Sequence, residues 1–339
     1  MPSSRLSIRI INTLEEFETF QEILRHFENT LAPTPIVAPS LERYWLLAFA
    51  RVYGPSRKLA ITIVFDDNFP QLILPLQLKD DASLEFLCDE TADYNDFFYG
   101  DMNGTLIKYA LDYWKINGVK KIRLDRLHPN SRTIELLYEI SKGENWDVTV
   151  DDCDSFAIVN VESNKEIQEW SGIQKNAIKR YLRKQNALKK IADVKFSFVN
   201  TKSQLIEIFP LIQRMHINRW DIKGIYSKYT DPRRQEFILN VCQDALNENG
   251  LFLPIMQING KLVSFIIGFR SGNTIYDWNT AFSVEYFKWS PGALLLLYVL
   301  SNYDTFSFTK YNLMRGLESY KLIWTNTVEK SLTVTIRFR

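Results

Sequence analysis

The stretch Lys288–Tyr303, KWSPGALLLLYVLSNY, has the spacing of a helix that begins at Ser290-Pro291-Gly292. Serine accepts hydrogen bonds from the first backbone N–H groups of a helix, proline favours the first helical position, and glycine lets another backbone or a ligand come close. Helix N-termini of this kind bind phosphate groups when they face a cleft. A capped core helix is the alternative, because most residues of the stretch are apolar.

The composition limits the classes of protein to consider. The chain has 339 residues, enough for one large domain or two ordinary ones, and a net charge of +1, so no overall field attracts it to nucleic acid or membrane. Cys88, Cys153 and Cys242 lack metal-ligand spacing and are typical of reduced thiols. No apolar signal segment opens the chain, and its longest apolar run, Ala293–Leu300, is too short to span a membrane. We expect a cytoplasmic protein without a metal.

The order helix, strand, strand, helix, strand occurs in each half of the chain. Each half has a helix followed by two runs of strand length: 41–54, 58–65 and 71–78 in the first half, and 235–250, 251–258 and 261–270 in the second. Asn259-Gly260 joins the second pair of runs, which predicts an antiparallel hairpin. A helix and a strand then follow over 104–127 and over 292–316.

Duplication is the simplest account of this repeat, and it predicts an α/β fold in which helices flank mixed sheets. We place the boundary near residue 160, which gives the domains 1–160 and 161–339. The two halves differ at the start of the second helix: Asp101 lies where it would repel a phosphate, whereas no acid lies near Ser290. We therefore expect only the second domain to bind an anion there.

A basic helix is predicted over Ser171–Ile191, where Ser171 and Gln174 fit a capping box. From Lys175 to Lys190 the helix has seven basic residues and no acid, and Lys175, Lys179 and Arg183 follow one another at i, i+4 spacing. Like charges at this spacing destabilise a helix slightly. A solvated face is the ordinary explanation, but the lack of any acid favours an anionic partner.

The second half resembles the GNAT-type acetyltransferases of the cellulose-biosynthesis (CelD-like) family, relatives of the Fem aminoacyltransferases. Together the matching motifs extend over about half of the chain. They are QKNAIKRYLRKQ (174–185), MHINRW (215–220), NGKLVSFIIGF (259–269), WSPGALLLL (289–297) and LMRGLESYKLIW (313–324), with ADYNDFF (92–98) as a weaker match in the first half. The resemblance implies tandem GNAT-like domains, with the catalytic residues mainly in the second, and an acyl-CoA or similar thioester donor.

The resemblance also implies where the donor binds. In a GNAT-like fold the donor pyrophosphate lies at the N-terminus of the helix that follows the central strand. The central strand here would be TIYDWNTAF (274–282). The expected donor-binding residues are Ser290, Gly292, Ala293 and Leu294, with Lys179 and Arg183 from the basic helix. One position departs from the family: the strand before Arg315-Gly316 usually has an Asp, and here it has Asn312.

Three residues are candidates for proton transfer. His216 shares a helix face with Arg219, and an imidazole can deprotonate an acceptor near neutral pH, although an isolated His beside an apolar stripe is more often structural. Glu318 is the second candidate base, and Tyr320 could protonate the departing thiolate. Both lie in a segment that follows a predicted strand, where functional residues concentrate.

Four residues are candidates for binding substrate. Arg219 could bind an acidic acceptor or a donor phosphate, and Arg315 and Lys321 belong to the family signature. Asp277 interrupts an otherwise apolar strand, so it lies either at a cleft edge or on a solvent face.

We expect direct transfer of an acyl group, acetyl in the simplest case, from a CoA thioester to an amine or hydroxyl of a small-molecule or saccharide acceptor. Two alternatives remain open. A Fem-like enzyme would use aminoacyl-tRNA, whose backbone would contact the basic helix. If the donor is linked to an acyl-carrier protein instead of CoA, the carrier would bind at the same helix. A catalytically silent GNAT scaffold is favoured by Asn312.

Overall fold

The computed structural model describes residues 5–20, 23, 38–88, 91–100 and 103–339. The chain divides into two units, one made of Met1–Asp154 with Lys330–Arg339 and the other of Ser155–Glu329. The division differs from the expected boundary near residue 160 mainly in its last segment. Residues 330–339 group with the first unit because their strand pairs with a strand of that unit.

The second unit is built on a mixed sheet. Its strands follow the order β10 (Val194–Phe198), β12 (Pro254–Ile258), β13 (Lys261–Ser271), β14 (Thr274–Phe282), β15 (Lys310–Arg315) and β9 (Trp146–Asn160), and β11 (Leu251–Phe252) also pairs with β13. All of these pairs are antiparallel except β14 with β15, which is parallel. The predicted Asn259-Gly260 hairpin is confirmed, because both residues have the positive φ values, 50° and 76°, that this tight turn requires.

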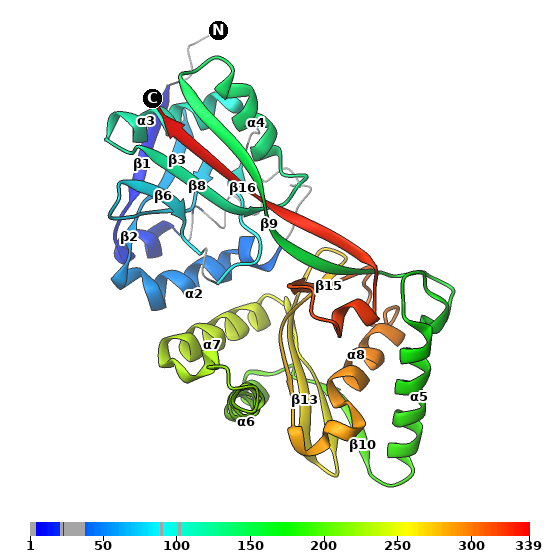
Figure 1. The fold of residues 1–339 in the computed structure, drawn as a ribbon. Helices are drawn as coiled ribbons and strands as arrows, with labels where there is room; N and C mark the ends of the chain where they lie inside the picture. The colour runs from blue at the N-terminus through cyan, green and yellow to red at the C-terminus, as the bar shows by residue number, and fades with distance from the viewer. Residues whose placement is uncertain (1–4, 21–22, 24–37, 89–90, 101–102) are drawn as a thin grey trace. The chain divides into compact units, whose positions relative to one another are not determined.

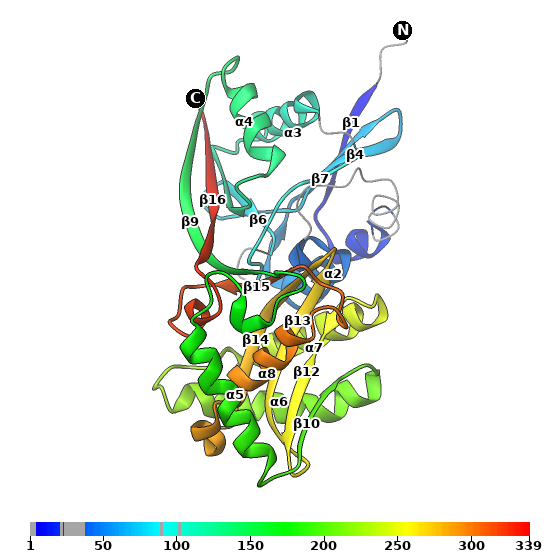
Figure 2. The same ribbon diagram turned by 90° about the vertical axis from the view of Figure 1, so that its right-hand side faces the viewer.

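Helices cover both faces of this sheet, as Figures 1 and 2 show. On one face lie α5 (Lys175–Lys189) and α8 (Pro291–Ser301), and on the other lie α6 (Lys202–Asp221) and α7 (Pro232–Asn247). Short 3₁₀ turns complete the unit: η3 (Ile167–Glu169), η4 (Lys228–Thr230), η5 (Val284–Trp289) and η6 (Lys321–Ile323). The predicted α/β class, with mixed sheets flanked by helices, is confirmed.

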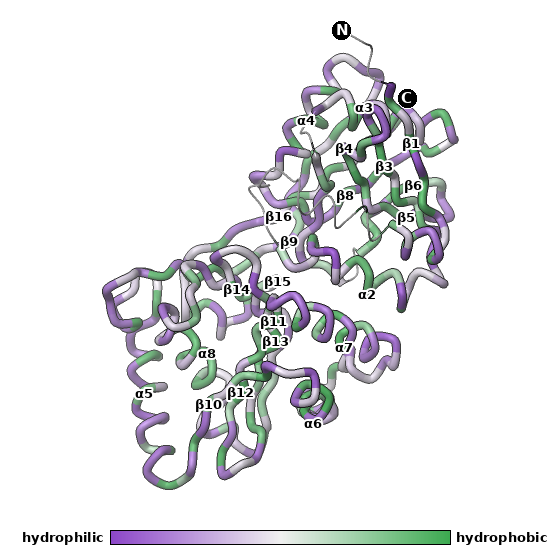
Figure 3. Tube along the Cα trace, turned by 180° about the vertical axis from the view of Figure 1, so that it is seen from behind, coloured by the Kyte–Doolittle hydropathy of each residue, from purple (hydrophilic) through white to green (hydrophobic). Residues whose placement is uncertain are grey.

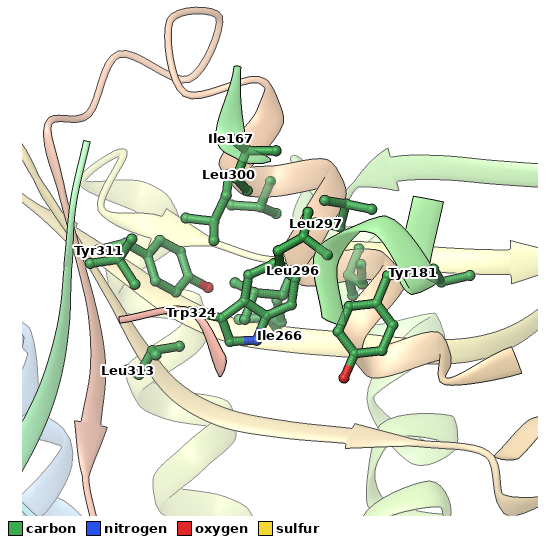
Figure 4. Close-up of a cluster of buried hydrophobic side chains, with 14 of the residues drawn as sticks. Ile167, Tyr181, Ile266, Leu296, Leu297, Leu300, Tyr311, Leu313 and Trp324 are labelled. Atoms are coloured by element: carbon green, nitrogen blue, oxygen red, sulfur yellow. The ribbon is translucent and has the colours of Figure 1, made fainter. Parts of the chain in front are cut away.

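Close packing joins α5 and α8 to the sheet. The consecutive leucines of α8, Leu294–Leu297, are all buried, and they lie in one core cluster with Tyr181 of α5 and Tyr311 of β15 (Figure 4). Tyr181 stacks on Trp324 with ring centroids 5.7 Å apart. A buried leucine of this kind contributes about 2–5 kcal/mol to stability, measured as the loss on truncation to alanine.

The first unit repeats the helix-and-hairpin order. One sheet has the strand order β1 (Leu6–Ile11), β3 (Ile61–Asp66), β4 (Phe69–Leu74) and β7 (Phe98–Tyr99). In the other sheet the consecutive strands are β16 (Thr327–Phe338), β8 (Lys121–Leu127), β6 (Ser83–Phe86), β5 (Leu76–Leu78) and β2 (Lys58–Leu59). Its helices include α2 (Arg43–Tyr53), α3 (Gly104–Ile116) and α4 (Arg132–Ser141), and its short 3₁₀ turns include η1 (Pro39–Leu41) and η2 (Gly54–Ser56). As in the second unit, one pair of strands, β6 with β8, is parallel.

The hairpin of the first unit is more broken than its sequence predicts. The runs 58–65 and 71–78 are each divided between two sheets, at Ala60 and at Pro75. Proline has no N–H to donate to a strand ladder, so an interruption at Pro75 is expected on physical grounds.

Two further sequence expectations concern cysteines and membranes. All three cysteines are free thiols, with Cys88 and Cys242 buried. Over the described ranges, no helix is long and apolar enough to cross a membrane, and no three His, Cys, Asp or Glu side chains are placed to hold a metal ion. Figure 3 shows the apolar residues gathered along the central strands, while α5 is largely hydrophilic.

Candidate functional site

The two parallel strands of the second unit separate part of the way along their length. β14 and β15 pair only at Thr274–Lys310, Ile275–Tyr311 and Tyr276–Asn312. Beyond Tyr276, β14 continues along β13 as far as Phe282, whereas β15 continues along β9. An edge of β14 without a β15 partner is therefore left next to the end of β15.

The end of β15 is held by a set of buried polar contacts. Asn312 Oδ1 accepts a hydrogen bond from the Met314 N–H at 2.8 Å, and Met314 has a left-handed φ of 60°. Lys321 is buried, and its ammonium donates to the carbonyls of Met314, Arg315 and Gly316 at 3.3, 2.6 and 3.3 Å. These contacts hold the turn where β15 leaves β14.

These contacts bear on two predictions. An Asp at position 312 would offer the same acceptor oxygen that Asn312 offers, so the Asn is explained by the turn and does not by itself favour a silent scaffold. Lys321 also pairs with Glu318 Oε2 at 2.9 Å, so its N–H groups already have partners within the turn.

Asp277 is the first residue of β14 beyond the last β15 pair. A β-bulge between Ile267 and Gly268 of β13 places Asp277 opposite Gly268, and bulges commonly redirect side chains next to functional sites. Gly268 is required there, because a Cβ at that position would lie 2.9 Å from the Tyr276 carbonyl oxygen.

The carboxyl group of Asp277 is buried and only half partnered. The residue is 8% exposed, and the Tyr311 hydroxyl donates to its Oδ2 at 3.1 Å. Its Oδ1 is buried and has no hydrogen-bond partner among the described residues. Burial raises the pKa of Asp277 from its usual value to about 7, against the opposing effects of the Tyr311 hydrogen bond and the Lys321 charge. A carboxyl group that titrates near neutral pH and has a free oxygen is suited to proton transfer.

Two phenols accompany this carboxyl group. Burial, with the negative charge of Asp277, raises the pKa of Tyr311 well above its usual range. Burial and the charges of Asp277 and Glu318 also raise the pKa of Tyr320, although 44% of this residue is exposed. Both phenols therefore stay protonated at neutral pH, which allows Tyr320 to act as a proton donor.

The N-terminus of α8 has an unusual cap. Ser290 is left-handed, with φ of 56° and ψ of 54°, and its side chain makes no cap hydrogen bond. Its hydroxyl instead accepts from the Lys184 ammonium at 2.8 Å. The Leu294 N–H donates to the Ser290 carbonyl at 3.0 Å, while the amides of Gly292 and Ala293 have no acceptor within the described part of the chain.

These contacts change the predicted set of donor-binding residues. The amide of Leu294 is used inside the helix, unlike those of Gly292 and Ala293. Lys179 and Arg183 are exposed, whereas Lys184 reaches the cap of α8. The sequence holds a signal for Lys184 that was missed: it lies three residues after Tyr181 and four before Leu188, both of which are buried.

His216 lies in a closed hydrogen-bonded group on α6. Its Nε2 accepts from the Trp220 indole N–H at 3.0 Å, so its Nδ1 carries the proton and donates to the Ser227 hydroxyl at 2.8 Å. Burial, with the charges of Lys228 and Lys223, lowers the pKa of His216 to about 4. Both ring nitrogens are used, which leaves no lone pair for an acceptor proton. The geometry supports a structural role for His216.

The remaining predicted residues lie at two places. The Arg219 guanidinium lies 4.5 Å from the centroid of the Phe282 ring, and a Cβ on Gly292 would lie 3.2 Å from that same ring. Arg219 and Gly292 therefore both approach the ring of Phe282. Glu318 is 56% exposed through its side chain and pairs with Lys321, and Arg315 is half-buried at the end of β15.

In the first unit, the N-terminus of α3 and the end of β8 have different contacts from those of α8 and β15 in the second unit. Asn103 caps α3 in the ordinary way, its side chain accepting from the Thr105 N–H at 2.8 Å. Where β8 ends, Asn95 donates its backbone N–H to the Arg126 carbonyl at 3.0 Å and its side-chain amide to the Asp125 carbonyl at 3.2 Å. A segment of the unit's own chain is therefore bound at the end of its parallel strand. Asp101 lies outside the described residues.

Parallel strands that separate beside a helix with free N-terminal amides define an acyltransferase fold of the GNAT type. Residues 175–322 match the acetyltransferase (GNAT) domain family, and this segment contains α5, β14, α8, β15 and Lys321. This segment of the chain is therefore similar to a GNAT acetyltransferase domain, and the match supports an acyltransferase. No curated protein sequence matches the chain.

Solved structures with the same fold include three that are similar over nearly the whole chain. A conserved protein of unknown function from Bacteroides thetaiotaomicron VPI-5482 has 15% identity, a TM-score of 0.61, and coverage of 98% of this chain and 100% of that chain. FemX has 9% identity, a TM-score of 0.59 and coverage of 97% and 96%. The C-terminal domain of a putative lysylphosphatidylglycerol synthetase from Agrobacterium fabrum has 10% identity, a TM-score of 0.58 and coverage of 93% and 91%. At these identities the similarity concerns the fold alone.

Proposed function

We propose that the second unit transfers an acyl group, acetyl in the simplest case, from a CoA thioester directly to an amine or hydroxyl of a small-molecule or saccharide acceptor. One observation carries this proposal: a buried carboxyl group with a free oxygen, Asp277, lies where the parallel strands separate. Such a group is suited to accept the proton that an attacking amine or hydroxyl must lose.

The donor would bind through its phosphate groups at the N-terminus of α8. The amides of Gly292 and Ala293 are free to donate, the helix dipole favours negative charge, and Lys184 adds a cation beside Ser290. Arg219 lies against the Phe282 ring, which a Cβ on Gly292 would also approach, and its guanidinium suits a donor phosphate or an acidic acceptor.

Asp277 takes the role of base that we expected of His216 or Glu318. The acceptor nucleophile loses its proton to Asp277 and forms a bond to the thioester carbonyl carbon. The C–S bond then breaks, and the Tyr320 hydroxyl protonates the departing thiolate. Solvent afterwards returns a proton to Tyr320 and takes the proton from Asp277. A backbone N–H on the free edge of β14 would stabilise the oxyanion.

The first unit is proposed to be a GNAT-like domain without a donor site, so that residues 1–160 support the catalytic domain and do not catalyse. Its α3 terminus is already capped by Asn103, and Asn95 is bound at the end of β8.

The motifs from Gln174 to Trp324 support a relationship to the CelD-like family. A CoA thioester donor fits a cytoplasmic location.

A Fem-like transferase that uses aminoacyl-tRNA is the second candidate. The cations of α5 favour it, because they have no acidic residue among them. A steep loss of activity with rising salt concentration is its expected signature.

Calorimetric titration of acetyl-CoA and of free CoA tests the donor site. We expect micromolar binding by the wild type and its loss in Gly292→Asp, since the new carboxylate would lie beside the phosphate. Gly292→Asn is the matched control: it meets the Phe282 ring in the same way but adds no charge, so it should bind much more tightly than the Asp variant. Equal affinities of the two variants, or no binding by folded wild type, would contradict the proposal.

A further inference from the structure

The solvent side of α5 carries a row of cations, here named the α5 basic face: Lys175, Lys179, Arg183 and Lys190. At 100° per residue the four positions fall within an arc of about 80°, roughly opposite the buried Tyr181 and Leu188. All four are exposed, and none has an acidic partner within the described residues. The row is about 22 Å long at 1.5 Å per residue.

Within the part of the chain that the structure describes, no acidic side chain pairs with these four cations. Like charges at i, i+4 destabilise a helix by a few tenths of a kcal/mol per pair, and Lys175 lies in the first turn, where the helix dipole disfavours a cation. A mixture of Lys and Glu on this face would avoid both costs and keep it equally soluble. The arrangement is therefore better explained by an anionic partner than by solvation.

The α5 basic face is physically connected to the proposed donor site. Ile178, Tyr181 and Leu188 of α5 pack in the same core cluster as the leucines of α8. Lys184, at the border of the exposed side, donates to Ser290 at the α8 terminus. A partner seated on the face would thus lie beside the amides that are proposed to bind phosphate.

The charge of the remaining chain limits the size of that partner. Of the 41 basic residues, seven lie on α5 and its cap, which leaves 34 against 40 acidic residues. A large polyanion such as RNA would contact more of the protein than this helix, and outside α5 and its cap acidic residues outnumber basic ones in the sequence. A single acidic helix of a small protein can contact the α5 basic face alone.

We propose that the α5 basic face docks an acidic helix of an acyl-carrier protein, whose phosphopantetheine arm carries the acyl group as a thioester. This inference rests on the proposed function, with the thioester of the carrier's arm taking the place of the CoA thioester at the same donor site. The single phosphate of the arm would bind the amides of Gly292 and Ala293, and transfer would break the C–S bond and leave the arm as a free thiol.

Fluorescence anisotropy with a labelled carrier protein that bears the phosphopantetheine arm tests the inference. We expect the double variant Lys179→Glu/Arg183→Glu to weaken carrier binding at least tenfold. This fold-loss of carrier affinity should be at least five times the fold-loss of acetyl-CoA affinity in the same variant. Lys195→Glu/Lys202→Glu is the matched control, because it changes the charge equally on exposed residues of β10 and α6. This control should bind the carrier as the wild type does.

The outcomes separate this inference from the proposed function. Acetyl-CoA binding with no carrier binding, or equal weakening by both double variants, would overturn the carrier inference alone. Carrier binding that tRNA displaces at lower concentration than unlabelled carrier would also overturn it, in favour of an RNA partner. Failure of both acetyl-CoA and carrier to bind would remove the proposed donor site itself.

Discussion

Replacement of Asp277 by Asn should make the protein more stable and less active at the same time. The folded-state pKa of Asp277 is raised to about 7 from a reference value of 3.8. A raised carboxyl pKa means that the unfolded chain ionises first, so stability is lost as the pH rises from about 4 through 7 and the loss is complete above that range. At 1.36 kcal/mol per pH unit, the full effect is of the order of 4 kcal/mol.

Chemical unfolding of wild type and Asp277→Asn between pH 4 and pH 8 measures this effect. We expect the variant to exceed the wild type by about 2–4 kcal/mol at pH 8 and the two to converge near pH 4. The stability of the wild type alone does not isolate the effect of Asp277, because His216 also titrates. The pKa of His216 is lowered to about 4, so the protein loses stability as the pH falls from about 6.5 towards 4 and this imidazole becomes protonated. The difference between variant and wild type removes that contribution, since His216 is present in both.

The same variant should lose most of its activity. We expect the wild-type kcat/KM to rise with pH through about 7, as Asp277 ionises, and Asp277→Asn to reduce it by about 10²–10⁴-fold. Asp277→Glu is the control that keeps a carboxyl group. A variant that is less stable than the wild type at pH 8, or as active as the wild type, would refute the assignment of Asp277.

Three other variants test the neighbouring residues. Lys184→Ala should weaken acetyl-CoA binding several-fold in calorimetry with little effect on stability, whereas unchanged affinity would exclude Lys184 from the donor site. His216→Phe should destabilise the protein by about 1–3 kcal/mol, because the Trp220 N–H and the Ser227 hydroxyl lose their partner. It should leave the midpoint of the kcat/KM pH profile unchanged. A shifted midpoint would restore His216 as the base. Lys321→Met should destabilise the protein by a similar amount in urea unfolding, because three carbonyls lose their donor, and a purely kinetic effect would instead favour substrate binding.

The sequence predicts those parts of the fold that depend on local patterns. The Asn259-Gly260 hairpin and the Pro291 start of α8 need only backbone preferences, and both are present in the structure. The break at Pro75 was missed because two apolar runs read as one hairpin. The grouping of residues 330–339 with the first unit depends on pairing across about 200 residues, which no local pattern shows.

The candidate site was predicted only in outline. Asp277 was recognised as an exception in an apolar strand, but Tyr276 and Trp278 on either side of it gave no alternation to show burial. Whether His216 is free or bonded depends on Trp220 and Ser227, which are four and eleven residues away along the chain. The choice between Lys184 and its neighbours depends on helix rotation, which Tyr181 and Leu188 do define.

The placement of β16 has a consequence for biosynthesis. Residues Leu332–Arg337 pair with β8 of the first unit, yet the ribosome makes them after the whole second unit. Until β16 is made, the edge of β8 that pairs with it has no partner strand. Exposed strand edges can pair with other chains. The unit that is translated first is therefore completed last, and nascent chains halted before Lys330 should need chaperones more than finished ones do.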